Sequence, residues 1–113
     1  MNIKRGNVFL ASLNPTIGNE INKTRPVIVI SNDINNEFSN TVTVIPITSN
    51  TIKIYPFEIF LKSGIANLPK DSKARTDQIR TIDKSRIIKE IGKIPAILIS
   101  DLENSIKIHL NLK

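Results

Sequence analysis

Hydrophobic positions along this 113-residue chain fall mostly into short runs that polar residues, glycine or proline interrupt. Short apolar or β-branched runs bounded by turn residues are typical of β-strands. They predict strands over residues 7–13, 27–30, 41–48 and 87–94, one or two short strands within 52–61, and a strand or tight hairpin within 72–82. Residues 83–86 fit a single helical turn, so the first 94 residues describe a mainly β structure.

The polar stretches between these runs carry the turn residues. Residues 14–24, 31–40, 49–51 and 63–71 are predicted as loops or turns because they are rich in Asn, Ser, Asp, Gly and Pro. Pro46 near the end of its strand predicts a sheet edge or a bulge, since proline has no N–H to donate to a neighbouring strand.

The hydrophobic spacing changes to three and four residues at the end of the chain, at Leu98, Leu102, Ser105, Ile106 and His109. This spacing is typical of an amphipathic helix and predicts one over Pro95 to Leu110. Ser100 and Glu103 also match a capping box, which would start the helix later. We therefore expect one α+β, mainly β domain over residues 1–113, a small barrel of short antiparallel strands with a C-terminal helix packed on it. His109 is expected to be a packing or interface residue.

Two polar side chains stand at the ends of the central strand pair. Arg25 precedes the apolar run 27–30, and Thr48 ends the run 41–48. If these strands pair antiparallel, the start of one lies beside the end of the other. Arg25 and Thr48 would then share one rim of the sheet, where a guanidinium and a hydroxyl can bind a phosphate. The structural alternative is that Arg25 only pairs with a carboxylate at the strand end.

Composition favours an anionic partner for this rim. Sixteen Lys and Arg against ten Asp and Glu give a net charge of +6 and a pI near 9.8, as in many nucleic-acid-binding proteins. Cysteine is absent, so disulfides and thiolate metal sites are excluded. No apolar run approaches the length needed to span a membrane, and the N-terminus lacks an apolar signal sequence, so we expect a cytoplasmic protein.

Five stretches resemble the MazF/PemK (Kid) family of toxin endoribonucleases in their order and spacing. They are Lys4–Val8, Gly18–Glu20, Arg25–Asn32, Pro46–Ser49 and Asp77–Arg86. The resemblance covers nearly the whole chain. It implies an SH3-like barrel that works as a homodimer, and a toxin that cleaves single-stranded RNA at specific sequences without a metal ion.

The resemblance also strengthens the assignment of catalytic residues. Arg25 is expected to stabilise the charge on the phosphate, and Thr48 to donate its hydroxyl to it. The family's corresponding Arg is often assigned a general-acid role. Glu20 in the loop 14–24 is the candidate general base, although a neighbouring guanidinium lowers the pKa of a carboxylate and weakens it as a base. A solvated loop carboxylate is the alternative interpretation of Glu20.

Uncharged donor–acceptor side chains on loops and strand ends are candidates for reading unpaired bases. They are Asn14, Thr16, Asn36, Ser49 and Gln78. Arg75 and Arg80 are candidates for contacting the RNA backbone. Phosphate-loop, zinc-protease and acidic-cluster motifs are absent, so we predict neither a metal nor a cofactor.

Two other functions remain open at this level. CcdB toxins share the expected fold but inhibit gyrase through a C-terminal Trp-Gly-Ile, whereas this chain has no Trp and ends Leu110–Lys113. A basic RNA-binding module without activity is the second alternative. For the toxin reading, the expected partner is an acidic, largely disordered antitoxin that lies across the RNA groove.

Overall fold

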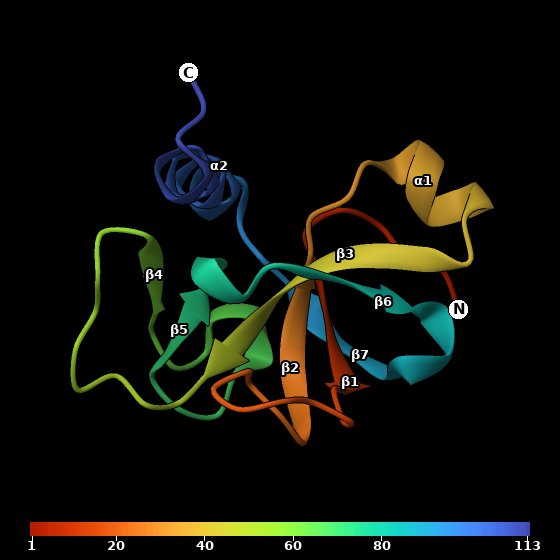
Figure 1. Cartoon of the computed structure of the whole chain (residues 1–113), viewed down its shortest axis with the longest axis horizontal. Coiled ribbons are helices and arrows are strands. Elements are labelled where there is room, and N and C mark those ends of the chain that lie inside the picture. The colour runs from red at the N-terminus through yellow and green to blue at the C-terminus, as the bar shows by residue number, and fades with distance from the viewer.

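A long central strand, β3, organises the sheet of this computed structural model, which describes all residues 1–113 (Figure 1). The hydrogen-bonded order is β4-β5-β3-β2-β1-β7, and β6 also pairs with β3. The strands are β1 (Asn7–Ser12), β2 (Thr24–Val29), β3 (Thr41–Thr48), β4 (Glu58–Leu61), β5 (Ser72–Arg75), β6 (Arg80–Asp83) and β7 (Ile87–Lys93). The helices are α1 (Asp33–Phe38), α2 (Ala96–Leu110) and the single turns η1 (Ile65–Asn67), η2 (Thr76–Gln78) and η3 (Lys84–Arg86). The sheet curves into a barrel-like fold without closing, which confirms the expected fold class.

The central strands pair antiparallel, as predicted. Val27 lies opposite Pro46, and Val29 opposite Val44. On its other side β3 pairs first with β6 and then with β5. Pro46 falls between these two partners, where a missing N–H costs no ladder bond on that side. The prediction of a sheet edge or a bulge at Pro46 is wrong, because β3 is a central strand and its register with β2 shows no shift there.

Hydrophobic side chains on the two faces of the central strands form two separate cores. Ile28, Ile45 and Ile47 pack on one face together with Leu61 of β4 and Leu102 of α2. The alternate positions of the same strands pack on the other face, with side chains of β1 and β6. Because successive residues of a strand point to opposite faces, nearly continuous apolar runs are required at the centre.

Helix α2 covers one end of the sheet, at the top of Figure 1, and begins one residue after Pro95. Leu102 and Ser105 are buried on its inner face, as the spacing predicted. The Ser105 hydroxyl lies 2.9 Å from the hydroxyl of Thr76, so a polar pair is satisfied inside this contact. Ser100 lies within the helix, and the later start suggested by the capping box is wrong.

Helix α1 was not predicted, because its six residues are too few to show a helical period. Asn32 caps it by accepting a hydrogen bond from the backbone N–H of Asn35. Asn and Asp residues favour helix N-termini as well as turns, so their presence alone does not distinguish the two.

Residues 72–82 also differ from expectation. β5 and β6 both pair with β3, at successive positions, and η2 separates them. They are therefore not a hairpin. Only β4 forms within residues 52–61, and the residues between β3 and β4 make a long loop. None of the helices has the length and apolar character that crossing a bilayer requires.

Candidate active site

The strand register brings Arg25 and Thr48 to the same rim. Arg25 is the second residue of β2 rather than a residue before it, and lies opposite Ala11 of β1. Continuing the β2–β3 register two residues beyond the Val27–Pro46 pair places Arg25 opposite Thr48. Thr48 in turn lies opposite Lys73 of β5. Since paired residues project from the same face of a sheet, Arg25, Thr48 and Lys73 form a cross-strand row.

Arg25 is half-buried, and its Nε donates a hydrogen bond to the backbone oxygen of Asn22, 3.1 Å away. None of the four ion pairs in the structure includes it. The sequence-level alternative, in which a carboxylate occupies Arg25, is therefore not what the structure contains. Its guanidinium remains available to bind an anion bidentately.

A hollow of about 270 Å³ opens beside this rim. Arg25 and Ser49 line it, and Lys70 adds a second cation. The remaining lining residues are Thr24, Pro26, Ile47, Leu68, Pro69 and Ser72. Thr48 does not line the hollow itself, but its two neighbours in the chain, Ile47 and Ser49, do. Two cations and several hydroxyls around one opening are suited to a phosphate-bearing ligand.

The loop between β1 and β2 approaches the same rim, at the bottom of Figure 1, near the start of β2 and the arrowhead of β3. Glu20 and Thr16 lie in this loop, Glu20 exposed and Thr16 half-buried. The Glu20 carboxylate accepts a hydrogen bond from the backbone N–H of Ile17, three residues earlier. Glu20 is thus held by its own loop, on the side of the molecule where Arg25 begins β2.

Two predicted base-reading side chains hold this loop in place. The Asn14 side-chain oxygen accepts a hydrogen bond from the backbone N–H of Lys23, 3.1 Å away. The Gln78 side-chain oxygen accepts one from the backbone N–H of Ile21, at 3.2 Å. These bonds use only the side-chain oxygens, so the amide NH2 groups of Asn14 and Gln78 remain possible donors to a ligand.

Asn36 does not belong to this site. It lies in α1, is 2% exposed, and its amide bonds the backbone oxygen of Ser31 at 2.8 Å. The expectation that it stands on an accessible loop is wrong. α1 precedes β3, whereas the rim is at the opposite end of that strand, so Asn36 is also remote from Thr48.

The two arginines expected along the RNA backbone are engaged elsewhere. The Arg75 Nη2 lies 2.6 Å from an Asp77 carboxylate oxygen, and its Nε 3.0 Å from Glu58. The hydrogen bonds between Arg75 and Asp77 raise the pKa of Arg75 and lower the pKa of Asp77. Arg80 is half-buried and donates to the backbone oxygen of Leu13. The charge of Arg75 is therefore paired within the protein, whereas Arg80 has only one neutral partner.

Sequence reasoning missed Lys73, Lys70 and Glu58. Lys73 is 7% exposed and Glu58 is 5% exposed, so this ion pair lies inside the protein, next to the Arg25–Thr48 row. A charged residue within the apolar run 57–61 is a signal of a buried charge. Nothing local indicates its partner, which is fifteen residues away in sequence.

The fold is barrel-like and carries an arginine without an ion pair, a hydroxyl and a carboxylate-bearing loop at one rim. The chain belongs to the family described as PemK-like, MazF-like toxin of type II toxin–antitoxin system, whose model matches residues 4–110. This confirms the resemblance found in the sequence.

Two relatives match along their whole length. Endoribonuclease MazF9 of Mycobacterium tuberculosis is 36% identical over 115 residues, covering 97% of this chain and 98% of the relative. Endoribonuclease EndoA of Bacillus subtilis is 36% identical over 113 residues, covering 99% of this chain and 97% of the relative.

Solved structures support the fold independently of sequence. The crystal structure of MazF from Deinococcus radiodurans superimposes with a TM-score of 0.87 at 23% identity, with 99% of both chains covered. A mycobacterial endoribonuclease, solved in complex with its cognate antitoxin, gives 0.81 at 16% identity, covering 98% of this chain and 97% of that chain. Together with the family match, the two endoribonuclease relatives decide against the CcdB-like alternative.

Proposed function

We propose that this protein is the toxin of a type II toxin–antitoxin pair and an endoribonuclease that cuts single-stranded RNA at specific sequences in the cytoplasm. The observation that carries this proposal is the position of Arg25, without an ion pair and on the rim of the hollow beside the end of β3, in a chain 36% identical to two endoribonucleases. An RNA-binding module without activity would account for the positive charge, but not for the 36% sequence identity to two endoribonucleases.

The proposed reaction uses the ribose 2′-OH as its nucleophile. Attack of the 2′ oxygen on the adjacent phosphorus forms a bond there, and the bond from phosphorus to the 5′ oxygen of the next nucleotide breaks. The products are a 2′,3′-cyclic phosphate and a 5′-hydroxyl. The site must accept the 2′ proton, stabilise the charged phosphoryl oxygens and supply a proton to the leaving oxygen. None of these steps requires a metal ion.

The residues at the rim divide these tasks. Arg25 offers a permanent positive charge and parallel N–H groups to the phosphoryl oxygens. Thr48, beside it in the cross-strand row, adds a neutral hydroxyl donor. Glu20 is the candidate that accepts the 2′ proton, because it is the carboxylate of the loop that leads into Arg25. The side chains proposed to read the neighbouring bases are those of Asn14, Thr16, Ser49 and Gln78. Asn36 is excluded from this group because it is buried.

The proposed partner is an acidic antitoxin that lies across the RNA-binding rim. A chain of net charge +6 attracts an acidic segment by the same forces that attract RNA. The mycobacterial endoribonuclease that shares this fold has been solved with its cognate antitoxin. An antitoxin that saturates the toxin while leaving RNA cleavage unchanged would contradict this placement.

Incubating the purified protein with a long RNA in excess EDTA tests the activity. We expect discrete fragments that carry 5′-hydroxyl and cyclic phosphate ends, at the same rate with and without EDTA. Binding without cleavage would leave the RNA-binding module as the function. Cleavage that needs added Mg²⁺ would overturn the proposed mechanism.

A further inference from the structure

Glu58 is a buried carboxylate that the proposed reaction does not use. It begins β4, directly after the long β3–β4 loop, and is 5% exposed. One of its oxygens accepts a hydrogen bond from the backbone N–H of Tyr55, at 2.8 Å. The same carboxylate lies 3.0 Å from the Lys73 ammonium, which itself donates to the backbone oxygen of Lys53, at 2.7 Å. The pair therefore attaches two points of the loop to β5.

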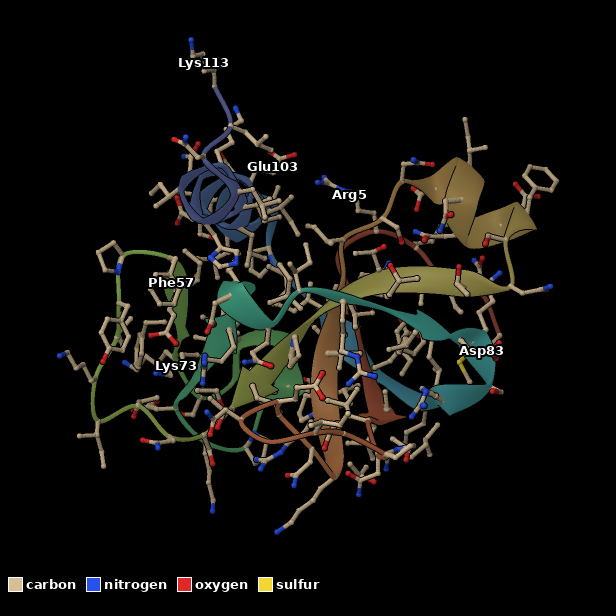
Figure 2. The ribbon with its side chains drawn as sticks, viewed as in Figure 1. Arg5, Phe57, Lys73, Asp83, Glu103 and Lys113 are labelled. Atoms are coloured by element: carbon tan, nitrogen blue, oxygen red, sulfur yellow. The ribbon has the colours of Figure 1, made fainter.

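Lys73 is the residue that places this pair beside the site, because it lies directly opposite Thr48 in the β3–β5 register. Figure 2 shows Lys73 and Phe57 on the side of the molecule where the β3–β4 loop runs, with Phe57 beneath α2. The Tyr55 and Phe57 rings stack 5.4 Å apart, and Phe57 contacts the ring of His109, 5.9 Å away. The loop is thus held against both β5 and α2.

The contacts continue from Glu58 to the other side of the rim. Arg75 lies 3.0 Å from Glu58 and bonds Asp77 of η2 through two nitrogens, at 2.8 and 2.6 Å. Gln78 follows Asp77 directly and accepts the hydrogen bond from Ile21 in the β1–β2 loop. Polar contacts, joined by the peptide link between Asp77 and Gln78, therefore run from the β3–β4 loop through Glu58 and η2 to the β1–β2 loop.

We propose that Glu58 is a positioning residue that joins these three segments into one rigid rim for the RNA strand. Glu58 touches neither the scissile phosphate nor a base. It acts through Lys73 and Arg75, whose charges it balances, and this inference rests on the proposed RNA substrate. Without it, two cations would face each other and the loop would lose its tie at Tyr55. Loops that must meet a flexible strand bind it more tightly when they are already ordered.

The test measures RNA binding and cleavage separately. The variant is Glu58→Gln, which keeps the shape of the side chain but removes its charge. Binding is measured by fluorescence anisotropy with a short 2′-deoxy-substituted RNA that lacks the nucleophile, and cleavage with the matching unmodified RNA. We expect Kd and KM to rise on the order of tenfold, with kcat changed far less, because misplacing a substrate-positioning segment costs binding before chemistry. Hydrogen exchange at the Tyr55 amide should become faster.

Two further variants keep the result interpretable. Glu103→Gln removes the other ion-paired glutamate, which bonds Arg5 at 3.0 Å on the exposed side of α2 (Figure 2), and should leave Kd and exchange at Tyr55 unchanged. The double variant Glu58→Gln with Lys73→Met leaves no unpaired lysine inside the protein, so it remains a test if the single variant fails to fold. It should show the same weakened binding.

Each outcome decides the inference. Wild-type affinity and KM in a folded Glu58→Gln protein, with faster exchange at Tyr55, would show that the tie exists but does not position RNA. Unchanged exchange would remove the tie itself. A wild-type protein that binds RNA without cutting it would refute the endonuclease while leaving the Kd comparison intact. A wild-type protein that does neither would overturn both.

Discussion

At the scale of single residues, position rather than chemical type separates the candidate catalytic groups from their neighbours. Arg25, Arg75 and Arg80 carry the same side chain. Arg75 is held by two carboxylates, whereas Arg25 and Arg80 each donate one hydrogen bond to a backbone oxygen. Arg25 and Arg80 therefore keep most of their donors, but of the two only Arg25 lines the hollow at the rim.

Arg25→Ala should abolish RNA cleavage while leaving the fold intact. Removing the charge that meets the developing negative charge of the phosphate should lower kcat on the order of 100-fold or more. Thr48→Ala should cost less, since a neutral hydroxyl is a weaker donor than a guanidinium. Cleavage time courses of both variants, with circular dichroism spectra, measure this. Near-normal cleavage by folded Arg25→Ala protein would remove Arg25 from the mechanism.

The Arg75–Asp77 pair predicts a pH dependence of stability. Its hydrogen bonds lower the pKa of Asp77 below the ordinary value, so this contribution is complete above the unfolded pKa and is lost as pH falls through the lowered folded pKa. Asp77→Asn should therefore lower the Tm at about pH 6 more than at about pH 2, because aspartate ordinarily titrates near ~3.9. Asp101→Asn, on the exposed face of α2, is the control. A Tm difference independent of pH would contradict the assignment.

At the scale of elements, α2 stabilises the protein through one face. Leu102 is completely buried within the core that also contains Ile28 and Ile45, while Ile97 on the same helix is 74% exposed. The helix and the loop before β4 meet at the Phe57 and His109 rings. Substitutions along α2 should therefore separate packing from surface effects sharply.

Leu102→Ala should lower the free energy of unfolding by about 2–5 kcal/mol, since it removes a fully buried side chain and leaves a cavity. Ile97→Ala should change it by less than about 0.5 kcal/mol as an exposed substitution. Urea denaturation of the two variants and the wild type measures both values. Equal losses would show that Ile97 is covered in solution, as a subunit interface on that face of α2 would require.

At the scale of the whole molecule, exposed apolar side chains suggest that the chain pairs with a second copy. Several lie at the C-terminal end of α2 and just after it, among them Ile108, Leu110 and Leu112, each at least 48% exposed. A +6 charge disfavours self-association by general repulsion, so an interface must be apolar and specific. We therefore expect a homodimer, as the family resemblance also implies.

Sedimentation velocity at micromolar concentration tests this expectation. A species of twice the 12.6 kDa chain mass should dominate, at a salt concentration that screens the net charge. Ile108→Lys, which places a charge in the exposed apolar group, should shift the population toward monomer while the circular dichroism spectrum stays unchanged. A wild-type protein that sediments only as a monomer would refute the homodimer.

Much of the architecture follows from local sequence. The apolar runs at 7–13, 41–48 and 87–94 and the three-and-four spacing after Pro95 identify strands and the helix, because each period reports which side chains of one segment share a face. Antiparallel pairing of two neighbouring strands then brings Arg25 and Thr48 together. To predict this rim, it was enough to assume that two strands adjacent in the sequence pair with each other.

Only the tertiary structure decided which of the other polar residues are free. Asn36 is buried by packing of α1, Arg75 is engaged by Glu58 and Asp77, and Lys73 is placed opposite Thr48 by a strand that follows 24 positions later along the chain. Burial and ion pairing depend on contacts between distant segments, and no local period encodes them. The sequence by itself therefore determined most of the strands and the candidate rim, while the fold determined which charges pair within the protein and which remain free for a ligand.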